Sequence, residues 1–136
     1  MRAAEISPNS NYSQAQFAYL QLYEGKLSEA AASCRTINNQ DDRLYCTAMV
    51  DHSLGHAPQA RQALNEYVAK NAMGDAYQIA EIYAWRGEND KAFEWLDRAY
   101  RQRDTGLAGI KLDRSFARLH GDTRFVALLR KLKLPE

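Results

Sequence analysis

The sequence predicts an all-α protein, built as a stack of three helical hairpins followed by C-terminal capping helices. Composition is the first observation behind this prediction. Only 3 Pro and 7 Gly occur among 136 residues, and the frequent residues Ala, Leu, Glu and Arg favour helix. The second observation is a regular spacing of glycines, in which Gly25, Gly55 and Gly87 lie 30 and 32 residues apart. Spacing of this kind indicates structural repeats that stack on one another.

Each of these glycines is flanked by small residues at fixed distances. Ala18 precedes Gly25 by seven residues and Ala30 follows it by five, and the same distances recur around the other two glycines. A glycine can end a helix in the left-handed conformation without a steric penalty. An alanine on each helix lets the two helices approach closely. The pattern therefore predicts a hairpin turn at each glycine.

Turn-forming residues separate the three predicted hairpins, at 38–41 and 71–74. Within the hairpins, apolar residues recur every three or four positions, as expected for helices with one buried face. Pro58 suits a first helical turn, where its missing N–H costs little. The expected helix pairs are Ser13–Glu24 with Leu27–Ile37, Asp42–Leu54 with Pro58–Lys70, and Asp75–Arg86 with Asp90–Arg101.

The C-terminal tail has a regularity of its own. Asp113 is followed by Phe116 and Leu119, and the same pattern recurs nine residues later from Asp122. An Asp can cap the start of a helix, and apolar residues three positions apart share one helix face. The tail is expected to form a short helix near 114–119 and a longer one near 123–132. These helices would cover the open end of the third hairpin, since stacked repeats need caps.

Residues 9–104 resemble the tetratricopeptide repeat, a unit of two antiparallel helices in about 34 residues. The best match runs from Ala76 to Asp104, and its motif residues are Ile79, Ala80, Tyr83, Gly87, Ala92, Leu96 and Ala99. The first two units depart from the motif, and the usual closing proline is missing in all three. The resemblance implies a right-handed superhelical stack, with a flexible segment at 1–10, three hairpins over 11–104 and a capping segment at 105–136.

The resemblance also implies a concave groove lined by the first helix of each hairpin. Seven of its eleven expected lining residues are aromatic or methionine, which suits the binding of a peptide or protein segment. Lys and Arg are absent, so an acidic C-terminal tail is a disfavoured ligand for this groove. The lining residues are Tyr12, Gln16, Tyr19, Tyr23, Tyr45, Met49, His52, Tyr77, Gln78, Glu81 and Trp85. The alternative role for any single tyrosine is packing between repeats.

Two functions follow from these resemblances. The first is a protein–protein interaction scaffold that holds a partner in the aromatic groove. The second rests on the segment 103–113 and the tail after it, which look like the C-terminal ending of tetratricopeptide regions in bacterial multidomain proteins. On that hypothesis the chain is a regulatory or sensory end-domain of a winged-helix regulator, a cyclase or a kinase, acting through intramolecular or oligomeric contacts.

The residues give no support for catalysis. The chain has no phosphate-binding glycine loop, no H-E-x-x-H and no G-x-S-x-G. The carboxylate pair Asp41–Asp42 lies where a helix should begin, and capping is the commoner use of such a pair. His52, His56 and His120 lie near turns without a second metal ligand on one face. We therefore expect no enzyme, no metal and no cofactor.

The charge distribution and the cysteine content bear on which partners and which cell compartment are expected. Residues 101–136 hold 9 Lys or Arg against 4 Asp or Glu, although the whole chain has a net charge of only +1. This basic end is interpreted as a solvated surface, with binding of acidic proteins, lipid or nucleic acid as the alternative. Self-association remains open. Cys34 and Cys46 are interpreted as small buried thiols, with a disulfide between them as the alternative, so the redox compartment stays open. With no signal peptide or membrane span, a cytoplasmic location is favoured and membrane insertion is not expected.

Overall fold

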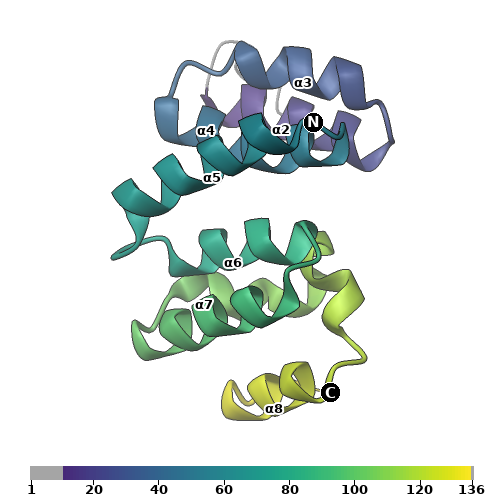
Figure 1. Ribbon diagram of the computed structural model, residues 1–136. Coiled ribbons are helices and arrows are strands. Elements are labelled where there is room, and N and C mark those ends of the chain that lie inside the picture. The colour runs from purple at the N-terminus through teal and green to yellow at the C-terminus, as the bar shows by residue number, and fades with distance from the viewer. Residues whose placement is uncertain (1–10, 136) are drawn as a thin grey trace. The chain divides into compact units, whose positions relative to one another are not determined.

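The computed structural model describes residues 11–135, with side chains from Gln14 onward, and every regular element in this range is a helix (Figure 1). The elements are α2 Asn11–Tyr23, α3 Leu27–Arg35, α4 Gln40–Ser53, α5 Ala57–Asn71, α6 Ala76–Trp85, α7 Asn89–Arg101, the 3₁₀ helices η1 Thr105–Leu112 and η2 Arg114–Leu119, and α8 Thr123–Lys131. The predicted all-α fold is confirmed, and the helix bounds agree with those of the predicted helix pairs to within two residues at each end. The predicted flexible segment 1–10 lies outside the described residues.

Three of these helices end at the predicted glycines. Gly25, Gly55 and Gly87 have φ angles of 80°, 86° and 79°, a region that side chains other than hydrogen rarely enter. The backbone N–H of the residue after each glycine donates to the carbonyl oxygen five residues earlier, as from His56 to Asp51 at 2.8 Å. This is the Schellman closure of a helix. The physical reason given for the glycines in the sequence is therefore confirmed.

The helices α7 and α8 end with the same closure but without glycine. Arg103 and Lys133 occupy the equivalent positions, with φ angles of 57° and 59°. The Asp104 N–H donates to the Ala99 carbonyl at 2.9 Å, and the Leu134 N–H donates to its partner five residues earlier at the same distance. Both helices thus finish on a basic residue in the left-handed conformation, where glycine would fit without strain.

The chain divides into two compact units, Met1–Ala69 and Lys70–Glu136. In the first unit, α2 packs against α3 and α4, and α3 packs against α4. The alanines that flank the first two turn glycines in the sequence are all fully buried here: Ala18, Ala30, Ala48 and Ala60. Their small side chains let the helix axes approach closely. Ile37, Val50 and Leu64 are among the larger side chains buried in the core of this unit.

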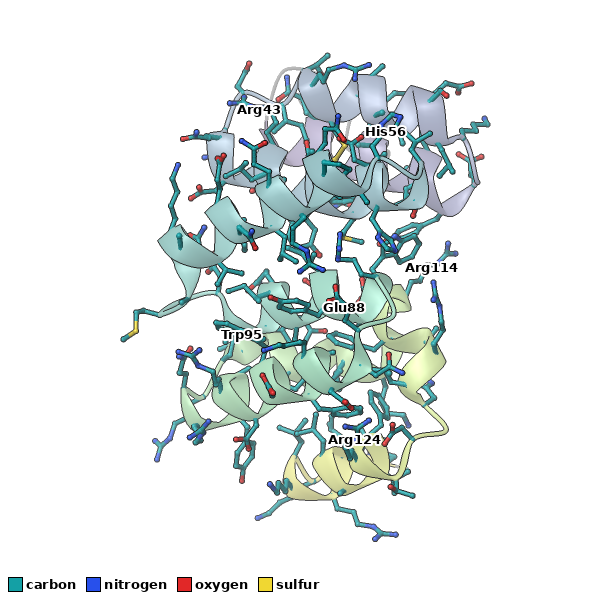
Figure 2. The ribbon with its side chains drawn as sticks, in the orientation of Figure 1. Arg43, His56, Glu88, Trp95, Arg114 and Arg124 are labelled. Carbon is teal, nitrogen blue, oxygen red and sulfur yellow. A yellow bond between two sulfur atoms is a disulfide. The ribbon has the colours of Figure 1, made fainter. Side chains whose placement is uncertain are left out.

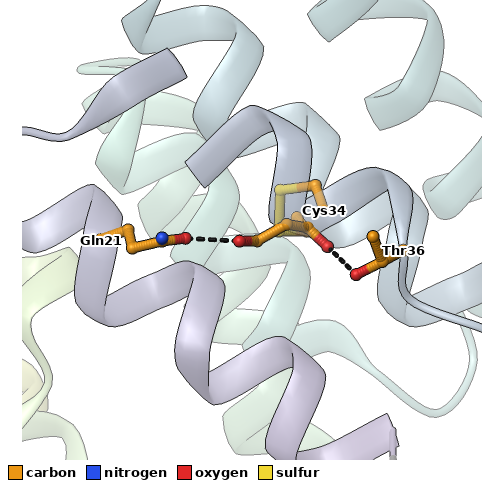
Figure 3. Close-up of a disulfide and its surroundings, with 5 residues drawn as sticks. Gln21, Cys34 and Thr36 are labelled. Atoms are coloured by element: carbon orange, nitrogen blue, oxygen red, sulfur yellow. Dashed lines mark hydrogen bonds between the residues drawn. A yellow bond between two sulfur atoms is a disulfide. The ribbon is translucent and has the colours of Figure 1, made fainter. Parts of the chain in front are cut away.

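A disulfide joins Cys34 on α3 to Cys46 on α4, so the favoured interpretation as unpaired thiols is wrong and the alternative holds (Figure 3). The two Cα atoms lie 5.6 Å apart, within the range that a disulfide spans, and both side chains are buried. The short connection between α3 and α4 brings residues 12 positions apart face to face. Beside the bond, the Ser33 hydroxyl donates to the Gln21 side-chain oxygen, which links α3 to α2 as well.

In the second unit, α6 packs against α7 on one side and against η1 and η2 on another. Ile79 and Ile82 of α6 are fully buried, and so is Phe116 of η2. Arg124 connects α8 to α7: its guanidinium donates to Asp90 at 2.9 Å and lies 4.3 Å from the ring centre of Phe93 (Figure 2). The tail is therefore held on two helices of the third hairpin.

Three copies of a nine-residue pattern, which we call the tail modules, form the C-terminal segment. Each begins with an Asp whose carboxylate accepts the N–H two residues later: Asp104 at 2.9 Å, Asp113 at 2.9 Å and Asp122 at 2.8 Å. The apolar residues three and six positions after each Asp are buried: Leu107 and Ile110, Phe116 and Leu119, Phe125 and Leu128. The second and third modules confirm the predicted caps and helices. The first was not predicted.

The cap of the third module also interacts with the side chain that follows it. The Arg124 guanidinium donates to both carboxylate oxygens of Asp122, at 3.1 Å and 2.9 Å. These side-chain hydrogen bonds, together with the backbone one, lower the pKa of Asp122 below its usual value. The start of α8 is thus held by a charge-assisted contact.

Across residues 11–135, no helix has both the length and the apolar character that a membrane span requires.

Candidate functional site

A cluster of tyrosines in the first unit is the most prominent of the predicted site features. Tyr19 of α2 and Tyr45 of α4 have ring centres 5.7 Å apart, and Tyr67 of α5 lies 5.8 Å from Tyr45. Both pairs meet edge to face, an arrangement that aromatic rings prefer. Tyr67 is buried, whereas Tyr19 and Tyr45 are half-buried. The cluster therefore has a fixed base on α5 and two partly accessible rings above it.

The predicted residues of α2 follow one another along the helix. Gln16, Tyr19 and Tyr23 are three and four positions apart and are each half-buried, so they share one helix face. Tyr12 is also in α2, but its side chain lies outside the described residues. The side chain of Phe17, on the same helix, is more exposed than these, at 52%. The α2 helix thus carries a half-buried tyrosine face and a separate exposed apolar position.

The predicted residues of α4 divide into core and surface. Met49 is only 1% exposed, so it packs inside the unit and does not line an open groove as predicted. Tyr45 and His52 are half-buried. Five predicted residues of this unit thus remain partly accessible, and we name them the tyrosine surface: Gln16, Tyr19, Tyr23, Tyr45 and His52.

Tyr77, the first predicted site residue of the second unit, is a packing residue rather than an open one. It is 5% exposed, and its hydroxyl donates to the Asp113 carboxylate at 2.7 Å. Its ring lies 5.5 Å from that of Phe116. Burial of the side chain raises the pKa of Tyr77 above its usual value, and the hydrogen bond to Asp113 raises it further. The side chain expected to line a groove instead joins α6 to the tail.

The close approach of Gly106 to Tyr77 gives a testable prediction. A Cβ at Gly106 would lie 2.6 Å from Cδ2 of the Tyr77 ring, so we expect Gly106→Ala to lower the free energy of unfolding by about 1–3 kcal/mol through overpacking. Urea unfolding followed by circular dichroism measures this loss. Gly109→Ala is the matched control, because it lies in the same helix and a Cβ there meets nothing within 4 Å. Equal effects of the two substitutions would contradict the prediction.

The other predicted residues of α6 are Gln78, Glu81 and Trp85, which are all half-buried. The Arg118 guanidinium of η2 reaches the Trp85 carbonyl oxygen at 3.5 Å. The tail therefore contacts α6 at both ends of this set of residues, through Tyr77 near its start and Trp85 at its end. A partner that bound to Gln78, Glu81 or Trp85 would therefore lie close to the tail.

The predicted site is thus brought together only in part. Tyr19 and Tyr45 meet within the first unit, whereas Tyr77 and Trp85 belong to the second. A continuous groove over all three hairpins stays a prediction. Tyr67 is a cluster member that the sequence analysis did not assign to the site. Its aromatic side chain, at a position where the tetratricopeptide motif prefers a small residue, is the signal that could have identified it.

Among the described residues, no group of three or more His, Cys, Asp or Glu side chains is arranged to hold a metal ion. Comparisons of the chain with protein-family models, with curated proteins and with solved structures found no match. The tetratricopeptide resemblance and its superhelical stack therefore stay predictions from the sequence.

Proposed function

We propose that this protein is an interaction scaffold, which binds a peptide or a segment of a partner protein at the tyrosine surface of its first unit. The observation that carries the proposal is the contact of Tyr19 with Tyr45, whose half-buried rings lie 5.7 Å apart on neighbouring helices. Tyrosine contributes a large apolar ring and a polar hydroxyl at low conformational cost, which is why it is frequent at binding hot spots.

The rigidity of the first unit supports this proposal. The Cys34–Cys46 disulfide joins α3 to α4, and the ring of Tyr45 rests on buried Tyr67. A surface that is ordered before binding loses less conformational entropy when the partner arrives. A partner rich in apolar and aromatic side chains suits the rings. This is the class of ligand that we expect.

The experiment is affinity capture from the source cell with the full chain, followed by titration calorimetry with the purified partner. We expect Tyr19→Ala to weaken binding by about thirtyfold, the effect of losing a hot-spot tyrosine worth about 2 kcal/mol. Tyr19 is chosen because it is half-buried, so the variant should fold. Circular dichroism and thermal unfolding verify that it does.

The matched control is Phe17→Ala, two positions earlier on α2. Phe17 is 52% exposed and lies outside the tyrosine surface, so its removal should leave binding unchanged. If Phe17→Ala abolished binding and Tyr19→Ala did not, the binding face would be the other side of α2. A folded Tyr19→Ala variant with unchanged affinity would contradict the proposal.

A further inference from the structure

A cavity of about 560 Å³ lies in the second unit, next to the C-terminal ends of α7 and α8. Its apolar lining includes the ring of Tyr100 and the side chains of Leu107, Leu132 and Leu134. Arg101 and Arg103 also line it. We call it the terminal pocket. Its volume falls within the range of about 300–1,000 Å³ that is usual for ligand sites in proteins.

The backbone around the terminal pocket is strained at two positions. Arg103 and Lys133 are the two non-glycine residues with positive φ in the part of the chain that the structure describes. Arg103 lines the pocket, and Lys133 lies between two residues that line it. At the three hairpin turns the same position of the same closure is glycine. Residues held in such conformations are enriched at functional sites, and here both side chains are basic.

The nearest carboxylate keeps its negative charge but forms no ion pair with the arginines of the pocket among the described residues. Asp104 lines the pocket too, but its oxygens already accept the N–H groups of Gly106 and Tyr77, at 2.9 Å and 3.2 Å. Arg101 pairs with Asp97 at 3.1 Å across a largely exposed contact, which is weak in water. The Arg103 side chain has no ion-pair or hydrogen-bond partner among the described residues. With two arginines and one carboxylate in its lining, the pocket has a net positive charge beside an apolar floor.

We propose that the terminal pocket binds a peptide segment of a partner protein in which acidic residues alternate with large apolar ones. The apolar side chains would enter between Leu107, Leu132 and Leu134. The carboxylates would meet Arg101 and Arg103, where Arg can form paired hydrogen bonds. Charge complementarity selects this partner over a neutral or basic peptide. The site is separate from the tyrosine surface and does not depend on that proposal.

The test uses the full chain and a fluorescein-labelled peptide in which Asp and Glu alternate with Leu and Phe. Fluorescence anisotropy measures its affinity, and amide chemical shifts locate it. We expect shifts at Tyr100, Leu107 and Leu134. The variant Arg103→Gly should weaken binding about tenfold, the loss of one charge-assisted contact. Its melting temperature should stay the same or rise, because glycine relieves the strained backbone.

This pair of readouts separates function from structure, since a residue retained for stability alone would lower the melting temperature when it is replaced by glycine. The control peptide carries Asn and Gln in place of Asp and Glu, and we expect it to bind about tenfold more weakly or not at all. The control variant is Arg35→Gly, an exposed arginine in the first unit, and it should bind normally. Equal affinity of wild type and Arg103→Gly, or of the acidic and amide peptides, would overturn the proposal. So would binding of phosphatidylserine vesicles in place of the peptide.

Discussion

Replacing Phe116 with Ala is expected to lower the free energy of unfolding by about 3–5 kcal/mol, the usual cost of emptying a fully buried aromatic site. Phe116 is fully buried on η2, with its ring 5.5 Å from that of Tyr77. The substitution removes the apolar contact between the tail and α6. The Tyr77 hydroxyl, which is tied to Asp113, would then lose the packing that keeps water away from that hydrogen bond.

Urea unfolding followed by near-ultraviolet circular dichroism is the measurement, because it reports on the tyrosine environment as well as on stability. Leu112→Ala is the matched control, since Leu112 belongs to the same tail but is 91% exposed. Its loss should change stability by less than about 0.5 kcal/mol. A small effect of Phe116→Ala would mean that the tail does not pack on α6 in solution.

The second large effect is expected from the disulfide. Replacing both Cys34 and Cys46 with Ala should lower the free energy of unfolding by about 3 kcal/mol, because the bond restricts the unfolded chain over a short loop. Treatment of the wild type with dithiothreitol should give a loss of similar size without changing any side-chain volume. The loss should appear in the first unit, which hydrogen exchange of α3 and α4 amides resolves.

The comparison of the two treatments gives the control. If the alanine variant were destabilised and the reduced wild type were not, the cause would be lost packing at two buried positions and not the bond. Mass spectrometry of the native chain, with and without alkylation, establishes whether the bond forms. Disulfides persist in oxidising compartments, so an intact bond in the cell would argue against the cytoplasmic location that the sequence favoured.

The features that the sequence predicted well are those that depend on the local preference of a single residue type. A helix closure with a left-handed residue favours glycine, so Gly25, Gly55 and Gly87 can be assigned to turns from their spacing and residue type alone. The caps at Asp113 and Asp122 were predicted for the same reason, since a short polar side chain before an apolar pattern has few other uses. Local chemistry of this kind is visible in the sequence itself.

The features that the sequence did not predict depend on which segments are neighbours in space. The pairing of Cys34 with Cys46 follows from the packing of α3 on α4, and a spacing of 12 residues does not show that. Tyr77 was expected to be open, because the tail was predicted to cover the end of the third hairpin but no residue of the tail showed which α6 side chains it would meet. The terminal pocket was missed for a related reason, since its lining comes from chain segments separated by more than twenty residues.

The tail modules have a consequence for how this chain can change in length. Each module carries its own capping Asp and its own two apolar anchors. The modules also join in the same way, since the Asp113 and Asp122 N–H groups donate to the carbonyl oxygens of Ile110 and Leu119 in the module before. Insertion or removal of nine residues at a module boundary would keep every later Asp and anchor in phase, whereas a change of any other size would not. Natural variation at this end of the molecule should therefore come in steps of nine.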